Sequence, residues 1–232
     1  MAEPIKRIKA SLHRIYGDKI GEQAFKKIFP LINGRMDGEM YRKDLFSEKD
    51  IILISYGDTL YRTGEVPLRT LHTFAERYLK NVVSTIHFLP FFPFSSDDGF
   101  SIMDYAAIRN DLGTWEDIDT LGRDFKLMFD LVLNHVSAKS EWFKRYLEEY
   151  SGFKHLAIEV DPAEDLSHVT RPRTTPLLTP YKKADGQTVH VWTTFSADQI
   201  DLNFTSLDVL EKMISVLLYY VRPVSYTHLR AH

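Results

Sequence analysis

The sequence predicts an α/β fold built around a parallel β-sheet. Three short apolar runs, rich in β-branched residues, suit strands that are buried on both faces. Segments with helical spacing lie between these runs, and an alternation of strands and helices indicates right-handed βαβ units. A doubly wound sheet and a (β/α)8 barrel both fit this order, and both bind ligands at the carboxyl ends of their strands.

Helices are predicted before the first strand. Residues 2 to 48 are rich in charge, and apolar residues recur at helical spacing from Ile5 to Ile15, after which Gly17 ends the pattern. A second helical pattern runs from Phe25 to Ile32, with a break near Pro30. We therefore expect an N-terminal helical extension over residues 1–48.

The elements of the sheet then follow in order along the chain. They are a strand at 51–56, a helix at 67–78, a strand at 82–89, a short helix from Thr114, a strand at 127–133 and a helix at 207–221. The first strand is an unbroken apolar run, which predicts burial on both of its faces. Thr114 and Asp117 have the spacing of a capping box, which opens a helix.

A long excursion separates the third predicted strand from the last helix. Residues 136–203 far exceed the ~2–6 residues of an ordinary βα loop. This segment contains one predicted helix around Trp142 to Tyr150 and one possible strand at His190 to Phe195. We interpret it as an inserted subdomain of the kind that sits over an active site.

Composition excludes several classes of protein. The 232 residues include 29 Lys and Arg against 32 Asp and Glu, so the net charge is −3 and no basic surface for nucleic acid is expected. The apolar runs are far shorter than the ~20 residues that cross a membrane, and the N-terminus lacks the apolar core of a signal peptide. We expect a cytoplasmic protein. The absence of cysteine excludes a thiol nucleophile and a cysteine-built zinc site.

Two strand ends carry candidate functional residues. The loop after the second strand mixes aromatic residues with Asp97 and Asp98, a combination that suits sugars, although Asp-Asp-Gly is also ordinary turn chemistry. The third strand carries Asp130, which needs a partner if it is buried, and ends in Asn134-His135. A histidine at a strand end can contact a ligand or only hydrogen-bond to a neighbouring loop.

Three further features of the sequence have side chains that can bind a ligand or pack in the core. Arg171-Pro172-Arg173 holds two guanidinium groups apart and can bind an anion, or it can form ordinary ion pairs in a surface loop. His87, within the second predicted strand, and Trp142, in the insertion, are interpreted as packing residues.

Several segments that occur in a fixed order carry a family resemblance. They are Leu89–Phe94, Ser96–Phe100, Asp104-Tyr105, Leu112–Trp115, Asp130–His135, Thr170–Arg173, Val191–Phe195 and Gln199–Asp201. Together they resemble the α-amylase superfamily, and within it the sucrose phosphorylase subfamily. Asp130–His135 matches the superfamily pattern Asp-x-x-x-Asn-His. The Ser-Ser-Asp-Asp-Gly-Phe-Ser loop, the Val-Thr-Arg-Pro-Arg segment and the helical extension look most like the glucosylglycerate phosphorylases of that subfamily.

The resemblance implies a partial (β/α)8 barrel with its first three strands and part of its helices. Residues 49–135 and 204–221 would form the barrel, and residues 136–203 would form the inserted B-type subdomain. These barrel segments hold fewer than half of the ~250 residues that a complete barrel takes, so we expect an N-terminal fragment. Residues 222–232 show no match to the family.

The resemblance also implies a reaction. The subfamily transfers an α-glucosyl group reversibly to inorganic phosphate with retention, and it uses no metal or organic cofactor. Among the reactions of the subfamily, we expect the phosphorolysis of glucosylglycerate to α-glucose 1-phosphate and glycerate. Sucrose or glucosylglycerol phosphorolysis and glucoside hydrolysis are the alternatives within the superfamily. A sugar-binding module without catalysis is the alternative from another class.

Site residues follow from the resemblance position by position. Asp97, Phe100 and His135 match donor-subsite residues: a carboxylate and a histidine that bind glucosyl hydroxyls, and an aromatic platform. Phe195 and Gln199 match residues of the inserted subdomain that border the donor and acceptor subsites. Arg173 matches an arginine that binds phosphate or an anionic acceptor. The nucleophile and the acid/base follow residue 221 in the family, and the chain reads Arg222-Pro223-Val224-Ser225 where the family has Arg-x-Asp-Ala. We therefore expect no catalytic carboxyl group in this chain.

Overall fold

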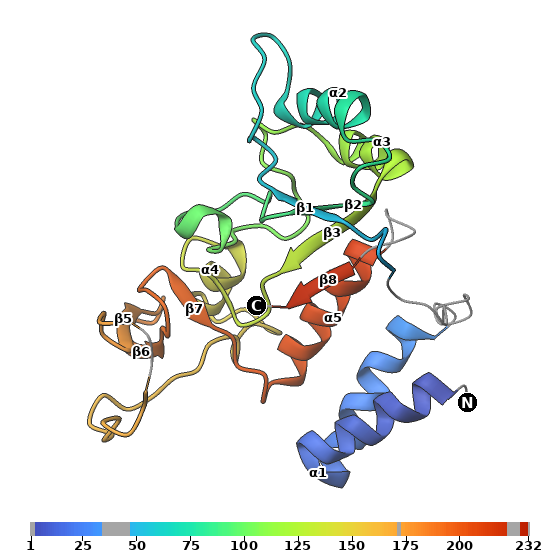
Figure 1. Cartoon of the computed structure of the whole chain (residues 1–232). Coiled ribbons are helices and arrows are strands. Elements are labelled where there is room, and N and C mark those ends of the chain that lie inside the picture. Colours follow the sequence, from blue (N-terminus) through green and yellow to red (C-terminus); the bar gives the residue numbers. More distant parts are fainter. Residues whose placement is uncertain (1–2, 34–46, 171–172, 222–227, 232) are drawn as a thin grey trace.

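Four parallel strands form the main sheet of this computed structural model, which describes residues 3–33, 47–170, 173–221 and 228–231. β1 (Ile52–Ser55), β2 (Thr85–Phe88), β3 (Lys126–Leu131) and β8 (His228–Ala231) pair in the order β1-β2-β3-β8 (Figure 1). The order of the strands in this sheet is their order along the chain, as in a (β/α)8 barrel. In a doubly wound sheet, by contrast, the order of the strands reverses at a switch point. The partial-barrel prediction is therefore confirmed.

The sheet has one strand more than the sequence predicted. β8 lies parallel to β3, with Met128 opposite His228. A strand at the edge of a sheet presents unpaired N–H and C=O groups, and β8 pairs with those on the outer edge of β3. Our expectation of only three strands was too low. Residues 222–227, between α5 and β8, lie outside the described residues.

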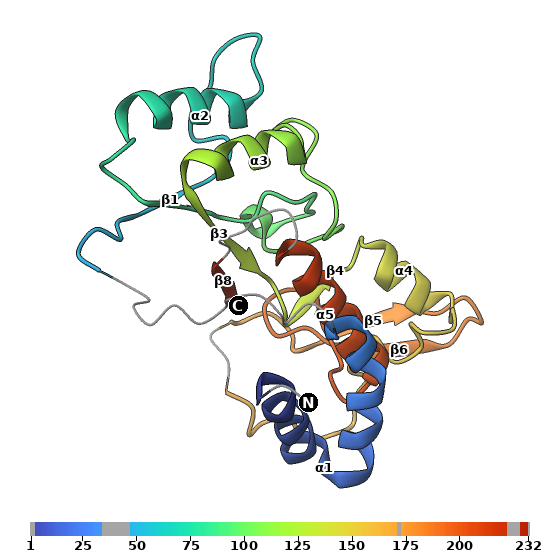
Figure 2. The same cartoon turned by 90° about the vertical axis from the view of Figure 1, so that its right-hand side faces the viewer.

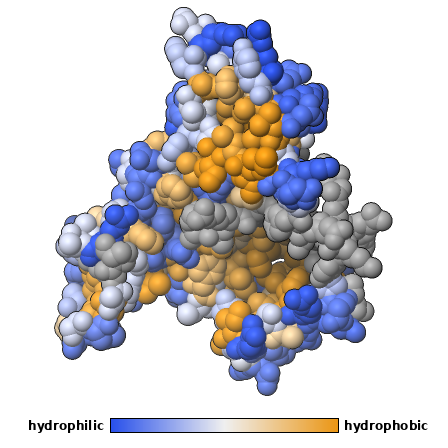
Figure 3. All heavy atoms as spheres, viewed as in Figure 1, coloured by the Kyte–Doolittle hydropathy of each residue, from blue (hydrophilic) through white to orange (hydrophobic). Residues whose placement is uncertain are grey.

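The first strand is more exposed than predicted. Among the described residues β1 pairs only with β2, so one edge of β1 is open, and its side chains Ile52 and Ile54 are 42% and 57% exposed. The expected burial of both faces of β1 is therefore wrong. Figure 3 shows an apolar patch in the region of β1, the strand that carries the exposed Ile52 and Ile54.

Helices cover the sheet where the sequence predicted them. α2 (Pro67–Tyr78) and α3 (Trp115–Asp124) lie side by side over it (Figure 2), and α5 is Leu207–Val221. The capping box is present, because the Thr114 backbone N–H donates to Asp117 Oδ2 at 2.8 Å. Within the described residues, no helix is both long and apolar enough to cross a membrane.

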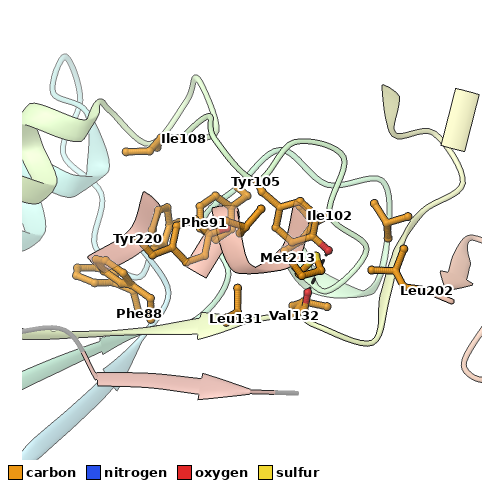
Figure 4. Close-up of a cluster of buried hydrophobic side chains, with 14 of the residues drawn as sticks. Phe88, Phe91, Ile102, Tyr105, Ile108, Leu131, Val132, Leu202, Met213 and Tyr220 are labelled. Atoms are coloured by element: carbon orange, nitrogen blue, oxygen red, sulfur yellow. Dashed lines mark hydrogen bonds between the residues drawn. The ribbon is translucent and has the colours of Figure 1, made fainter. Parts of the chain in front are cut away.

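An aromatic cluster joins α5 to the ends of β2 and β3. Phe88, Phe91, Phe92, Phe129 and Tyr220 are all at most 1% exposed. The rings of Phe92 and Tyr220 stack with centroids 5.0 Å apart, and Phe91 meets Phe129 edge-on at 5.1 Å. Figure 4 shows Tyr220 of α5 reaching toward Phe88 and Phe91. This packing fixes the strand ends from which the loops of the next section begin.

The N-terminal helices pack on the outer side of α5. α1 (Glu3–Ile32) is interrupted at Gly17, which has a φ of 73°, so the chain folds into two helical arms (Figure 1). The break at Gly17 was predicted, whereas the helix passes Pro30 and ends at Ile32. Apolar residues of α1 contact Ile214 of α5, and Tyr16 donates its hydroxyl hydrogen to Phe204 O at 2.8 Å.

The insertion contains two small antiparallel sheets. β4 (His135–Ser137) pairs with β7 (Gln199–Asp201), and β5 (Leu178–Lys182) pairs with β6 (Thr188–Trp192). α4 (Glu141–Leu147) follows β4 and confirms the predicted helix, although it is shorter than expected. The strand predicted at His190 to Phe195 is β6, shifted toward the N-terminus.

A first prediction concerns the docking of α1. Ile28→Ala removes a side chain that is 2% exposed within the α1–α5 contact, so the free energy of unfolding of the chain should fall by ~2–4 kcal/mol. Urea unfolding followed by circular dichroism measures this change. Ile20→Ala, at a position 45% exposed on the same helix, is the matched control and should change stability by less than ~0.5 kcal/mol. Equal effects of the two substitutions would contradict the packing.

Candidate functional site

Three segments meet at the carboxyl ends of β2 and β3. Residues 89–103 leave β2 and fold back on themselves, with an antiparallel bridge between Phe94 and Ile102. Residues 132–137 follow β3 and lead into β4, and residues 195–201 arrive from the insertion through β7. The pairing of β4 with β7 sets His135 opposite Asp201. The carboxyl edge of a parallel sheet is where (β/α)8 barrels place their functional groups.

The tip of the first segment has an unusual backbone. Asp97 and Asp98 have φ values of 57° and 49°, and Gly99 follows with a φ of 105°. A Cβ on Gly99 would lie 2.8 Å from the carbonyl oxygen of Pro90, so a side chain does not fit there. Two left-handed aspartates in succession cost ~1–3 kcal/mol each, and such conformations cluster at functional sites. The Asp-Asp-Gly sequence is thus a turn, and this turn also presents Asp97.

Asp97, Gln199 and His135 form one hydrogen-bonded group. The side-chain amide nitrogen of Gln199 donates to Asp97 Oδ2 at 2.9 Å and lies 3.1 Å from His135 Nε2. The amide oxygen of Gln199 accepts a hydrogen bond from the hydroxyl of Ser196 at 2.9 Å, which fixes the orientation of the amide. Gln199 is 2% exposed, whereas Asp97 is exposed. A buried amide therefore holds an exposed carboxylate next to a buried imidazole.

His135 is held in its neutral form. Burial lowers the pKa of its imidazole below the ordinary value, and the carbonyl oxygen of Phe100 and the charge of Asp97 oppose this shift only in part. The Nε2 atom lies 2.9 Å from Phe100 O, while Nδ1 is buried and has no hydrogen-bond partner among the described residues. A second proton on the ring would thus leave a buried N–H unpaired, which agrees with the lowered pKa.

Two aromatic residues complete the predicted donor site. The ring of Phe195 lies against the ring of His135, with centroids 5.1 Å apart and the planes inclined by 56°. Phe100 is half-buried, and its ring packs against the main hydrophobic core. Its carbonyl oxygen contacts His135 directly. Five of the six predicted site residues, namely Asp97, Phe100, His135, Phe195 and Gln199, therefore lie together.

Arg173 is the sixth predicted site residue, and it is exposed. Within the described part of the chain, no hydrogen bond or ion pair joins it to the other five residues. Its neighbours Arg171 and Pro172 lie outside the described residues. The anion-binding role of Arg173 stays a prediction.

Asp130 has the partner that its burial requires. His87 Nε2 lies 3.0 Å from Asp130 Oδ1, and both side chains are at most 2% exposed. His87, expected to be a packing residue, is thus also the hydrogen-bond partner of a buried carboxyl group. Trp142 packs against Tyr105 with ring centroids 5.3 Å apart, as a packing residue should.

Residues that sequence reasoning did not select also support the site. The hydroxyl of Tyr105 lies 3.0 Å from both Val132 O and His135 O, so it fixes the turn between β3 and β4. Asp198, next to Gln199, accepts hydrogen bonds from several serine hydroxyls. The sequence hint for Asp198 is the group of serines on either side of Asp97, which need an acceptor. This group of serines does not form a recognised motif.

The arrangement suits a polyhydroxylated ligand. An exposed carboxylate accepts hydrogen bonds from hydroxyl groups, and a neutral imidazole and an amide can each donate and accept hydrogen bonds. A phenyl ring can contact the C–H face of a sugar. No group of three or more His, Asp or Glu residues that could hold a metal ion occurs in the described residues.

The order of the strands and the position of the site at their carboxyl ends are those of a (β/α)8-barrel protein. The model of the α-amylase catalytic domain matches residues 76–227, more than half of the chain. The chain belongs to the α-amylase family.

Similar proteins are phosphorylases. The glucosylglycerate phosphorylase of Escherichia coli is 51% identical over 180 residues, which are 78% of this chain and 32% of that protein. The glucosylglycerate phosphorylase of Spirochaeta thermophila is 45% identical over 94% of this chain and 38% of its own length. The crystal structure of sucrose 6F-phosphate phosphorylase from Thermoanaerobacter thermosaccharolyticum superposes with a TM-score of 0.69 at 30% identity, covering 77% of this chain and 38% of that one. The chain thus spans about a third of the length of these relatives.

A second prediction follows from the buried imidazole of His135. Because its folded-state pKa lies below its unfolded value of ~6.5, its contribution to stability is complete above pH ~6.5 and is lost as the pH falls through the folded-state pKa. The free energy of unfolding should therefore decrease more between pH 7 and pH 5.5 in the unsubstituted chain than in His135→Gln. Urea unfolding at the two pH values measures both decreases. An identical pH dependence of the two proteins would show that His135 carries no such linkage.

Proposed function

We propose that the protein to which this chain belongs is a retaining α-glucosyl phosphorylase. Its proposed reaction converts glucosylglycerate and inorganic phosphate into α-glucose 1-phosphate and glycerate. The observation that carries the proposal is the hydrogen-bonded group of Asp97, Gln199 and His135 at the strand ends. The glucosylglycerate phosphorylases that are 43–51% identical to this chain support the choice of acceptor.

In this proposal the described residues bind the glucosyl group. The Asp97 carboxylate accepts hydrogen bonds from sugar hydroxyls, and His135 binds an outer hydroxyl once the sugar displaces part of its present hydrogen bonding. Phe195 and Phe100 limit the subsite on its apolar sides. Arg173 would bind phosphate or the glycerate carboxylate, since a guanidinium group pairs well with either anion. The cytoplasmic location and the lack of a cofactor remain sequence-based predictions.

Retention requires two further carboxyl groups that lie ~5–5.5 Å apart. One attacks the anomeric carbon while the other donates a proton to the leaving glycerate oxygen. Phosphate then attacks the glucosyl-enzyme and releases the first carboxylate, while the second group takes up a proton from phosphate, so two successive inversions give net retention. The part of the relatives that this chain does not span, about two thirds of their length, would supply both groups. The open edge of β1, with its exposed Ile52 and Ile54, supports a barrel that closes on further strands.

The test of this proposal is the activity of the complete protein. The chain is extended with the sequence encoded downstream of codon 221 in its source DNA, and glucose 1-phosphate is measured after incubation with glucosylglycerate and phosphate. Release that requires both compounds is the expected result. Release from sucrose or glucosylglycerol alone would contradict the glycerate assignment. Free glucose formed without phosphate would indicate a hydrolase, and binding of glucosides without turnover would indicate a sugar-binding module.

The role of His135 gives a third prediction. His135→Ala in the complete protein should lower kcat/KM for phosphorolysis by more than ~10-fold, the factor that corresponds to ~1.4 kcal/mol of lost transition-state binding. Initial rates of glucose 1-phosphate formation measure this loss. His155→Ala, an exposed histidine of the insertion, is the control and should leave the rate unchanged. Unaltered kinetics of His135→Ala would remove this residue from the donor site.

A further inference from the structure

A partly buried cluster of serines lies next to the site and surrounds one carboxylate. The hydroxyls of Ser95 and Ser96 lie 2.5 Å from Asp198 Oδ2, and that of Ser101 lies 3.0 Å from the same atom. Ser137 Oγ is 2.5 Å from Ser95 Oγ and 3.4 Å from Asp198 Oδ1. We refer to Ser95, Ser96, Ser101 and Ser137 as the serine cluster.

Every member of this cluster lies within two positions of a site residue in the sequence. Ser96 precedes Asp97, Ser101 follows Phe100, and Ser137 lies two residues after His135 on the same face of β4. Asp198 itself precedes Gln199. A single carboxylate therefore connects the three chain segments that carry the donor site.

Backbone contacts hold the same junction. The carbonyl oxygen of Asp198 accepts the Ala138 N–H at 2.9 Å and also lies 2.9 Å from the Ser101 hydroxyl. Ser137 N–H donates to Ile102 O at 2.9 Å, and both Ser101 and Ser137 are fully buried. Asp198 is thus tied to segments 95–102 and 137–138 by side chain and backbone together.

The carboxylate of Asp198 is ionised in this environment. Burial opposes its charge, but the hydroxyls of Ser95, Ser96 and Ser101 outweigh that effect, and the pKa of Asp198 lies below its ordinary value. Hydrogen bonds to an ionised acceptor are about twice as strong as those between neutral groups. Several such bonds on one carboxylate restrict the relative movement of the segments that donate them.

We propose that Asp198 is a positioning residue for the glucosyl-binding site. By gathering the serine cluster, it fixes the distances among Asp97, His135 and Gln199 without contacting the sugar itself. This inference rests on the proposed function, because only a glucoside-binding enzyme would use that geometry for turnover. A misplacement of such groups by ~1 Å can lower the rate of a reaction by ~100-fold.

The experiment compares Asp198→Ala with Asp198→Asn. Alanine removes every side-chain acceptor, whereas the asparagine oxygen can replace Oδ2 and its NH2 can donate toward Ser137 Oγ. Asp185→Ala is the matched control, because Asp185 lies in an exposed turn of the same insertion and its carboxylate accepts only the Gln187 N–H among the described residues. All variants are assayed well below the midpoint of their thermal unfolding, so that the folded fraction is equal.

In the complete protein, Asp198→Ala should lower kcat/KM for glucosylglycerate phosphorolysis by ~10–100-fold. Asp198→Asn should recover most of this loss, and Asp185→Ala should equal the unsubstituted enzyme. A folded Asp198→Ala enzyme with kcat and KM within about twofold of the unsubstituted enzyme would overturn the proposal. So would an asparagine variant as impaired as the alanine variant, since the hydrogen bonds would then not be the cause.

A second measurement needs no activity and uses the 232-residue chain alone. The side-chain NH2 signals of Gln199 in 1H–15N spectra report its hydrogen bond to Asp97 Oδ2 and its contact with His135 Nε2. Asp198→Ala should shift or broaden these signals, and Asp185→Ala should leave them in place. Unmoved Gln199 signals in Asp198→Ala would refute the positioning role even if the complete protein proves to have another activity. Shifted signals in a protein without phosphorolysis would instead retain the positioning role and reject the proposed function.

Discussion

The parallel pairing of β2 with β3 is the constraint on which the site depends. Its register sets Phe88, the last residue of β2, opposite Phe129, two residues before the end of β3, so both strands end at the same edge of the sheet. The loops that leave them begin side by side, and neither loop could reach the other's site residues if one strand slipped along its neighbour. Register is specified by burial, because a one-residue slip would turn the apolar side chains of both strands away from their neighbours in the core.

The site also requires that the inserted segment, residues 136–203, return to the carboxyl ends of β2 and β3. The β4–β7 pairing does so with only three residues in each strand, and it places Gln199 opposite Ser137. Three residue pairs are a weak anchor for so long an excursion, since a two-stranded sheet is marginally stable alone. Side-chain hydrogen bonds therefore have to add to the backbone pairing. The bonds to the carboxylate of Asp198, and the bond from Thr194 N–H to Asp201 Oδ2 at 2.5 Å, supply this addition on both sides of Gln199.

Sequence patterns predicted the parts of the molecule that local rules govern. The helix starts at Pro67 and Thr114, the break at Gly17 and the βαβ order all follow from residue type and spacing. The patterns failed where the burial of a strand depends on which other strands pair with it. Ile52 and Ile54 belong to an apolar run typical of a central strand, yet β1 is an edge strand here. The fourth strand was missed for a related reason, because pairing with β3 does not leave a periodic signature in four residues.

For the site, the resemblance selected six residues, of which the structure brings five together, but it did not show how these five are held. The strained turn at Asp97 and Asp98 is a case in point. A left-handed aspartate pair is unfavourable by itself, so other contacts have to compensate for it, and here these contacts come from Gln199 on one side and from Ser96 bound to Asp198 on the other. Both partners lie about a hundred positions away in the sequence, and a local pattern cannot encode such contacts. Since every one of these contacts is made between residues 88 and 201, the proposed glucosyl-binding half of the site is assembled by a single continuous stretch. In the proposed enzyme, other strands would add the catalytic carboxyl groups without rearranging this stretch.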